Sequence, residues 1–379
     1  MTTTKTGPLS GLQVVEMAGL GPAPMAGQLL ADLGANVIVV DRRAGERIDK
    51  DVNRRGKQSI ALNMKSDGAL KVFFSLIEKA DILIEGFRPG VMERLGLGPD
   101  ECLARNPGLI YGRMTGWGQE GPLSHTAGHD LNYLAMTGML HAIGEEGRPP
   151  FPPLNMAADY GGGSMFLLLG VLSALFERTK SGKGQVIDAA MVDGVPAMLG
   201  IIYSLLGRGL WQDKRQANLL DGGAPFYRCY ETSDGRYLSV GSLEPQFFAL
   251  LLKGLNLPAE LAQIQMSMKE WPRLEEQIGN AIKAKSLEHW TGVFAGTDAC
   301  VAPVLSIEEA NAASLNTERG NRIRLGGVTQ AAPAPRFSRT VPQAPEPAGK
   351  TGDHTSQILQ ELGFSEADIN DMKKSRILA

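Results

Sequence analysis

Histidine is scarce in this sequence, and one of its five members stands in a context that suits proton transfer. The 379-residue chain contains His125, His129, His141, His289 and His354. His129 follows Gly128 and precedes Asp130, a residue type that often caps the start of a helix. A helix start would place free backbone N–H groups beside the imidazole, where an anion is favoured. The sequence therefore favours His129 as an acid or base, although its spacing alone leaves a structural role open.

Two carboxylates have similar double interpretations. Asp159 precedes the three glycines at 161–163, which would let the backbone come close to a bound group, and Glu244 precedes a proline at the expected start of a helix. Either carboxylate could simply be a favourable residue at a helix N-terminus. Each is a candidate for catalysis only when the pattern of the whole chain is considered.

Basic residues follow several expected strands and could bind a polyanion. They are Arg42 and Arg43, then Arg54, Arg55 and Lys57, and later Arg88 and Arg94. The loops at the carboxyl ends of parallel strands share one crevice, so these side chains could converge there. Guanidinium groups bind phosphate oxygens in pairs, as the diphosphate and 3′-phosphate of coenzyme A (CoA) would require. Solvated surface charge is the alternative for each residue, and Arg42 and Arg94 are the best candidates.

A glycine-rich turn at 19–24 raises the alternative of a nicotinamide cofactor. The turn lies between an expected strand and an expected helix, and Asp41 ends the next strand as the ribose ligand of a dinucleotide fold would. Pro24, however, occupies the third glycine position of that fingerprint, and Arg42 follows Asp41 directly. Nicotinamide binding is therefore disfavoured.

The hydrophobic pattern predicts an α/β fold with a mostly parallel sheet. Apolar runs at 12–17, 35–41, 59–64, 81–87 and 108–114 alternate with helical patterns, and a further strand is expected after residue 183. A long helix is expected over 131–144. We expect a Rossmann-like large domain over 1–185, completed by 310–379, and a smaller α+β domain over 221–295. Residues 186–220 form the expected linker helices, and 296–309 the linker back.

Composition excludes several classes of protein. The chain is 43% apolar and 21% charged, which is typical of a globular protein, and its formal charge of −3 argues against nucleic-acid binding. Its three cysteines are far apart, so neither disulfides nor a zinc site are expected. We expect a cytoplasmic location, where thiols stay reduced. No run of about 20 uninterrupted apolar residues predicts a membrane span.

Several sequence blocks, in their order and spacing, resemble the α-methylacyl-CoA racemases, members of the family III CoA-transferases. The blocks are AGHDLNY at 127–133, ADYGGG at 158–163, LDGGAPFY at 220–227 and GSLEPQF at 241–247, with LADLGANVIVVDR at 30–42, SGKGQVIDAAMVDG at 181–194 and GTDACVAPVL at 296–305. The similarity extends over essentially the whole chain. Blocks that occur together in one order are far more specific than any single motif.

The resemblance implies specific roles for residues. His129 and Asp159 would be the two acid/bases on opposite faces of the substrate α-carbon, and Glu244 of a partner subunit would hold the imidazole. The CoA thioester would lie among Arg42, Ala61, Leu62, Asn63, Met64, Gly86, Phe87, Arg88, Arg94, Gly128, Asp130, Leu131, Asn132 and Tyr133. The resemblance also implies an interlocked homodimer with the active site at the subunit interface, and neither a metal nor a cofactor beyond substrate CoA.

The expected reaction interconverts (R)- and (S)-2-methylacyl-CoA thioesters through an enolate. Such chemistry needs a base on each face of the α-carbon and donors for the enolate oxygen, for which the Asp130 amide is our hypothesis. A family III CoA-transferase with Asp159 as a nucleophile is the alternative, and it would need no second base at His129. A non-catalytic CoA-binding protein is a third, weaker possibility.

Overall fold

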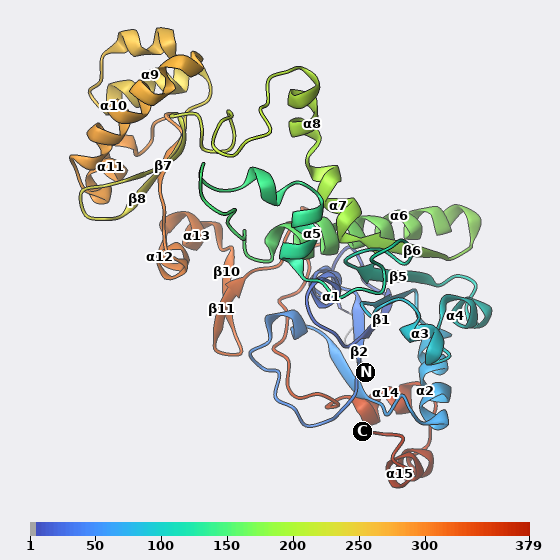
Figure 1. Ribbon diagram of the computed structural model, residues 1–379. Coiled ribbons are helices and arrows are strands. Elements are labelled where there is room, and N and C mark those ends of the chain that lie inside the picture. Colours follow the sequence, from blue (N-terminus) through green and yellow to red (C-terminus); the bar gives the residue numbers. More distant parts are fainter. Residues whose placement is uncertain (1–4) are drawn as a thin grey trace. The chain divides into compact units, whose positions relative to one another are not determined.

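A six-stranded parallel sheet forms the centre of the first part of the chain (Figure 1). The computed structural model describes residues 5–379. The strands are β1 (Gln13–Met17), β2 (Asn36–Asp41), β3 (Gln58–Ala61), β4 (Ile82–Glu85), β5 (Ile110–Thr115) and β6 (Gln185–Ala190). They are ordered β3-β2-β1-β4-β5-β6, with every neighbouring pair parallel. The predicted α/β class and parallel sheet are confirmed.

Helices between the strands cover the sheet and bury its apolar residues. These helices are α1 (Pro22–Asp32), α2 (Asp67–Ile77), α3 (Val91–Arg94), α4 (Pro99–Arg105) and α6 (Met165–Ser181). All four residues of β4 are buried, as expected for a strand covered on both faces. One core packs Phe73 of α2 with Leu83 and Tyr111 of the sheet and with Ile358 near the end of the chain.

The chain divides into two compact units, and each has its own core. The first comprises the residues up to Thr137, Pro153–Met198 and Ser314–Ala379, and the second comprises Gly138–Pro152 and Leu199–Ala313. These bounds differ from the expected ones, and the expected linkers at 199–220 and 296–309 belong to the second unit together with 310–313. Residues 138–152 group with the second unit, whereas β6 and α7 (Met191–Met198), expected partly in a linker, belong to the first.

The second unit combines a small antiparallel sheet with helices. Its strands are β7 (Tyr227–Glu231), β8 (Tyr237–Gly241) and β9 (Val301–Pro303), ordered β7-β8-β9. Its helices are α8 (Gly200–Gly207), α9 (Pro245–Gly254), α10 (Trp271–Lys283), α11 (Leu287–Phe294) and α12 (Ile307–Ala312), with shorter turns η2 (Leu140–Ala142), η4 (Ala259–Ile264) and η5 (Met268–Glu270). Phe226, Phe248 and Trp271 form the aromatic centre of its core.

The last part of the chain returns to the first unit. It contains α13 (Ser314–Arg319), the hairpin β10 (Arg322–Leu325) and β11 (Val328–Ala331), and the short helices α14 (Thr355–Glu361) and α15 (Glu366–Lys374). Backbone bonds join this segment to the outer edge of β3, where Ala379 N–H donates to Ala61 O and Leu62 pairs with Leu378. The hairpin has no counterpart in the sequence prediction.

One continuous helical stretch, Met156–Ser181, is long and apolar enough by length and composition to cross a membrane. In this unit it packs on the sheet instead: Leu167 and Val171 lie over Gly112 of β5, and Gly170 lies against Ile187 of β6. Asp159 is within the stretch. Residues of this stretch that face away from the sheet, such as Leu169 and Phe176, are exposed.

The helix expected over 131–144 is shorter than predicted. Helix α5 comprises Asp130–Met136, and Gly138 then adopts φ +83°, a left-handed conformation that ends the helical path. The apolar pattern beyond this point belongs to the separate turn η2. The prediction was wrong because a glycine within a periodic stretch was taken as tolerated.

Candidate active site

Several predicted CoA residues follow strands β2, β3 and β4 at the carboxyl edge of the sheet. Arg42 follows β2, Leu62 follows β3 and Gly86 follows β4. In the order β3-β2-β1-β4-β5-β6 the chain reverses direction across the sheet between β1 and β4, and ligands of open α/β sheets bind in the crevice at this point. The loop after β1, which contains Gly21, ends at the same edge. The loops that carry Arg42, Leu62 and Gly86 therefore lie at or beside this crevice.

Two of the predicted CoA residues contact each other directly. The Arg42 guanidinium lies 6.0 Å from the centroid of the Phe87 ring, within cation–π range. Arg42 and Arg88 are both exposed. Arg94, also exposed, ends α3, and its Nη1 would lie 3.0 Å from a Cβ built at Gly90. These three arginines therefore remain accessible to an anionic ligand.

An ion-pair network built on the buried residues Glu85 and Arg113 holds the turn at 86–88, and sequence reasoning missed it. Arg113 of β5 donates from Nε to Glu85 Oε1 (3.0 Å) and from Nη1 to Glu93 Oε1 (2.7 Å). Glu85 in turn accepts from the backbone N–H of Phe87 at 2.7 Å. Burial raises the pKa of the Glu85 carboxyl. An arginine in the middle of an apolar strand was the available sequence signal.

Asp159 lies in a π-helix rather than at a helix cap. The π-helix η3 comprises Met156–Ser164 and continues into α6. Wide π turns are uncommon and frequently occur at functional sites. Asn155 Nδ2 donates to Asp159 Oδ2 at 3.4 Å, and a Cβ at Gly21 would lie 3.6 Å from the same oxygen. Gly21 has φ +75°, a backbone conformation that favours glycine at this position.

His129 is the N-cap residue of α5, the position that was predicted for Asp130. Its carbonyl accepts from the N–H groups of Asn132 (2.8 Å) and Tyr133 (3.2 Å), and its own N–H donates to Asn132 Oδ1 at 3.1 Å. The His129 side chain is exposed. Asp130 is the first residue of the helix, and its carboxylate binds elsewhere: Oδ2 accepts from the backbone N–H groups of Ala158 and Asp159, both at 2.8 Å.

Electrostatic interactions link His129, Asp159 and Tyr133. Burial raises the pKa of the Asp159 carboxyl; the bond from Asn155 lowers it, the charge of Asp130 raises it, and His129 lowers it. Burial also raises the pKa of Tyr133, with a further contribution from the charge of Asp159. Asp159 is therefore a stronger base than an ordinary aspartate.

The predicted segment 128–133 folds back on itself through its aromatic residue. The Tyr133 hydroxyl donates to Gly128 O at 2.5 Å, and its ring packs edge-on against Trp117 with centroids 4.7 Å apart. Leu131 is exposed on the first turn of α5. The loop before His129 is thereby fixed to the helix that follows it.

The C-terminal segment supports the predicted residues Ala61–Met64, which sequence reasoning did not foresee. Asn63 N–H donates to Ile377 O at 2.9 Å, and Asn63 Nδ2 donates to Arg376 O at 3.2 Å. Ala44 N–H, near Arg42, donates to Ala379 O at 3.1 Å. These contacts join residues more than 300 positions apart, so no local pattern could have indicated them.

Glu244 belongs to the second unit. It is the N-cap residue of α9, as the sequence predicted, and its side chain is exposed. Its role beside the imidazole remains a prediction.

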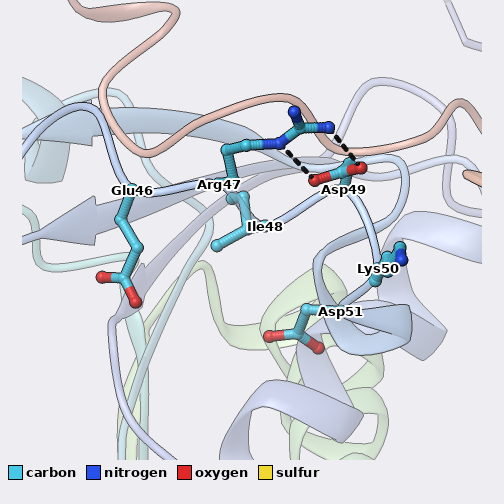
Figure 2. A pocket seen from close by; sticks show the side chains of 6 residues that line it. All are labelled: Glu46, Arg47, Ile48, Asp49, Lys50 and Asp51. Atoms are coloured by element: carbon cyan, nitrogen blue, oxygen red, sulfur yellow. Dashed lines mark hydrogen bonds and ion pairs between the residues drawn. The ribbon is translucent and has the colours of Figure 1, made fainter.

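A hollow of about 600 Å³ lies along the loop that follows Arg42. It is lined by the consecutive residues 46–51, and Figure 2 shows the Arg47 guanidinium joined to the Asp49 carboxylate by two hydrogen bonds. Neither His129 nor Asp159 lines this hollow. Its charged side chains are therefore not part of the proton-transfer chemistry.

Asp41, considered as a ribose ligand, is already engaged within the fold. Its carboxylate pairs with Arg54 and accepts from Ser59 Oγ at 2.6 Å, and its side chain is buried. These bonds occupy the group that a dinucleotide would need. Within residues 5–379, no group of three His, Cys, Asp or Glu side chains could hold a metal ion.

The sheet order and the residues at its carboxyl edge define an α/β protein built on the topology of nucleotide-binding enzymes. Residues 9–355 match the family model of CoA-transferase family III, and the chain belongs to this family.

Alpha-methylacyl-CoA racemase of Mus musculus is 46% identical over 98% of this chain and 97% of its own length. The racemase of Homo sapiens is 43% identical with the same coverage. The crystal structure of a CAIB/BAIF family protein from Brucella suis superposes with a TM-score of 0.80 at 26% identity, covering 94% of this chain and all of that one. The resemblance to the racemases is confirmed.

Proposed function

We propose that this chain is an α-methylacyl-CoA racemase that interconverts the (R) and (S) forms of 2-methylacyl-CoA thioesters. The high identity to two racemases over nearly their full length supports the assignment. Within this chain, the assignment rests on the hydrogen bond that connects α5 to η3. Asp130, the residue next to His129, accepts this bond from the backbone N–H of Asp159 at 2.8 Å. Two acid/base groups of different chemistry are thus held on adjoining elements.

The proposed reaction is a 1,1-proton transfer. One of the pair removes the α-proton, and the electron pair of the broken C–H bond moves into the thioester, which becomes an enolate. The other group then donates a proton to the opposite face, and the two exchange roles in the reverse direction. The Asp130 backbone N–H is the proposed donor to the enolate oxygen. Written this way, the reaction needs no cofactor beyond the CoA of the substrate.

A raised pKa at Asp159 suits this exchange of roles. His and Asp differ by more than two pKa units in water, so an ordinary aspartate would be a poor base beside histidine. Partial burial of Asp159 narrows that difference. A stronger base at Asp159 suits a reaction in which this group must both remove and return a proton.

The CoA part is proposed to bind at the carboxyl edge of β2, β3 and β4. Arg42, Arg88 and Arg94 are exposed there and suit the phosphate groups, and the Arg42–Phe87 pair suits the adenine, because an aromatic base can stack on both side chains. The 61–64 and 128–133 segments are proposed to line the thioester.

The active form is proposed to be an interlocked homodimer in the cytoplasm, with Glu244 of one subunit serving His129 of the other. Helix α6 supports the dimer: Met165, Leu169, Leu172 and Phe176 recur at helical spacing and are all exposed. A contiguous apolar face of this kind marks an interaction site. Light scattering that gives the mass of a single chain would contradict this part of the proposal.

The first test is incubation with (S)-2-methylacyl-CoA in deuterium oxide, with α-proton exchange followed by NMR and enantiomers by chiral chromatography. Exchange with appearance of the R form, without an acceptor acid, is the expected result. His129→Ala and Asp159→Ala should each lower the rate by about 100-fold or more, whereas His125→Ala, in an exposed loop, should not.

The same experiment distinguishes the rival function. If no exchange occurs, but CoA moves to a carboxylic acid once one is supplied, the chain is a family III CoA-transferase. Asp159 would then act as a nucleophile that forms a mixed anhydride with the acyl group and releases CoA thiolate. In that case His129→Ala should leave the transfer largely intact.

A further inference from the structure

The Asp130 carboxylate is buried against the backbone of η3 and has no part in the mechanism proposed above. Its side chain belongs to a residue only 5% exposed. One oxygen, Oδ2, accepts from the N–H groups of Ala158 and Asp159, each at 2.8 Å. The other oxygen, Oδ1, is buried and has no hydrogen-bond partner among the residues that the structure describes.

Burying a carboxylate with one unpaired oxygen lowers the stability of the fold. A buried carboxylate with one unsatisfied oxygen loses hydration that two neutral N–H donors replace only in part. A neutral residue of similar size could accept from the same two N–H groups at lower cost. The charge itself therefore calls for an explanation, and the nearest titratable group on η3 is Asp159, whose pKa the Asp130 charge raises.

We infer that Asp130 is a positioning residue with two separable effects on the reaction: its Oδ2 fixes the backbone of Asp159 relative to His129, and its charge strengthens Asp159 as a base. The inference rests on the proposed racemisation for its catalytic consequence. The positional effect follows from the chain itself, because Asp130 is covalently bonded to His129 and hydrogen-bonded to Asp159. Any shift of α5 against η3 would change the placement of both bases together.

The other elements packed around η3 do not supply a competing charge. Helix α1 contributes Gly21 and Pro22, and α7 contributes Gly194 and Val195, while Asp193 of α7 is exposed. The charged residues of the two nearest strands are engaged elsewhere. Arg113 of β5 pairs with Glu85 and Glu93, and Asp188 of β6 accepts from Gln119 N–H at 2.9 Å. His129 and Tyr133 are the remaining titratable groups that interact with Asp159, and the bond from Asn155 is uncharged.

Two substitutions separate the effects. Asp130→Asn keeps an oxygen that can accept from both N–H groups and removes the charge, whereas Asp130→Ala removes both. Asp188→Asn is the matched control, because it neutralises another carboxylate that accepts from a backbone N–H but does not act on the pKa of Asp159. Three readouts are compared: the pH profile of kcat/KM, hydrogen–deuterium exchange of the peptide containing Ala158 and Asp159, and the Asp159 pKa from carboxyl-labelled aspartate NMR.

Asp130→Asn should lower the pKa of Asp159, move the acid limb of kcat/KM to lower pH, and leave exchange at Ala158 and Asp159 close to that of the wild type. Asp130→Ala should raise that exchange and lower kcat by about 100-fold, because a displaced base costs roughly this much, with a small change in KM. Asp188→Asn should change none of these readouts.

An unchanged Asp159 pKa in Asp130→Asn would overturn the electrostatic effect, and unchanged exchange in folded Asp130→Ala would overturn the positional one. If Asp130→Ala does not fold, raised exchange at these two amides in Asp130→Asn would likewise overturn the positional effect. Exchange and NMR need no turnover, so an inactive wild-type protein would refute the racemase proposal while both physical effects are still measured.

Discussion

The guanidinium of Arg42 lies 6.0 Å from the centre of the Phe87 ring, and this contact joins the ends of two strands that are not neighbours in the sheet. Arg42 follows β2 and Phe87 follows β4, with β1 between them. The pair therefore bridges the part of the carboxyl edge where the sheet order reverses. An arginine held this way presents its planar face and its donors in a fixed orientation.

Replacing Arg42 should weaken substrate binding without changing the chemistry. Arg42→Ala should raise KM for 2-methylacyl-CoA by about tenfold, since a charge-assisted bond to phosphate contributes roughly 1.5–3 kcal/mol, and kcat should stay within about twofold. Arg105→Ala is the matched control, because Arg105 lies over Phe74 at 5.0 Å on the surface of α4. Equal effects of the two variants on KM, measured by steady-state kinetics, would contradict a specific role for Arg42.

A wholly buried ion pair beneath α1 should dominate the stability of the first unit. Lys57 Nζ donates to Glu16 Oε2 at 2.6 Å and to Pro24 O at 2.8 Å, and both charged side chains are almost fully enclosed. Lys57→Met should lower the free energy of unfolding by about 3–5 kcal/mol, because it leaves the Glu16 carboxylate buried without its partner. Urea denaturation measures the loss. Glu16→Gln combined with Lys57→Met should cost less than the two single changes added together, and strict additivity would refute the coupling.

Asn155 should tune the acid limb of the reaction in the direction opposite to Asp130. Its Nδ2 donates to Asp159 Oδ2 at 3.4 Å, and this bond lowers a carboxyl pKa that burial raises. Asn155→Ala removes the donor, so the pKa of Asp159 should rise and the acid limb of kcat/KM should move to higher pH. A pH–rate profile of the free enzyme reports this limb. A limb that stays in place would show that the long Asn155 bond does not act in solution.

The sequence predicted the strands and helices that carry the site better than the hydrogen bonds between them. Alternating strand and helix patterns identified all six strands of the parallel sheet, and Asp41 and Arg42 were correctly expected at the end of one of them. The π-helix around Asp159 was missed, because its extra residue per turn has no signature in apolar spacing. The hydrogen bond between the Asp130 carboxylate and the Asp159 N–H was missed for another reason. Asp130 was interpreted as the N-cap of its own helix, but its carboxylate accepts from backbone N–H groups of η3 instead.

Stability should fall in mildly acidic solution through His354. The backbone N–H of Ser59 donates to His354 Nδ1 at 3.2 Å, and the backbone N–H of His354 donates to Ser59 O at 3.1 Å. The first bond forms only when Nδ1 is unprotonated, and both bonds fix the edge of β3. Burial lowers the pKa of His354 below its ordinary value of 6.5. The unfolded chain then binds the proton more readily than the folded one. The contribution to stability is complete above pH 6.5 and is lost as pH falls from there through the lower folded pKa.

Thermal unfolding between pH 5 and 8 tests this linkage. His354→Gln keeps an acceptor and does not titrate, so its melting temperature should fall less between pH 7.5 and pH 5.5 than that of the wild type. His125→Gln, in an exposed loop, should follow the wild type. If His354→Gln and the wild type lose stability in parallel, other groups cause the pH dependence.

The exposed face of α6 should decide the oligomeric state. Leu167, Val171 and Ala174 point into the first unit, whereas Leu169 and Phe176 are 61% and 64% exposed. The edge strand β6 also leaves Val186 exposed. Burying a side chain of this size in an interface contributes about 1.5–3 kcal/mol.

A glutamate at either position would have to lose its hydration there, so Leu169→Glu with Phe176→Glu should convert the proposed dimer into monomers. Light scattering coupled to size-exclusion chromatography measures the mass, and Leu169→Met with Phe176→Leu, which keeps the face apolar, should remain dimeric. Because the partner is proposed to supply Glu244, the monomeric variant should also lose racemisation while its thermal unfolding shows a folded chain. A glutamate variant that stays dimeric and active would assign the interface to another face of the protein.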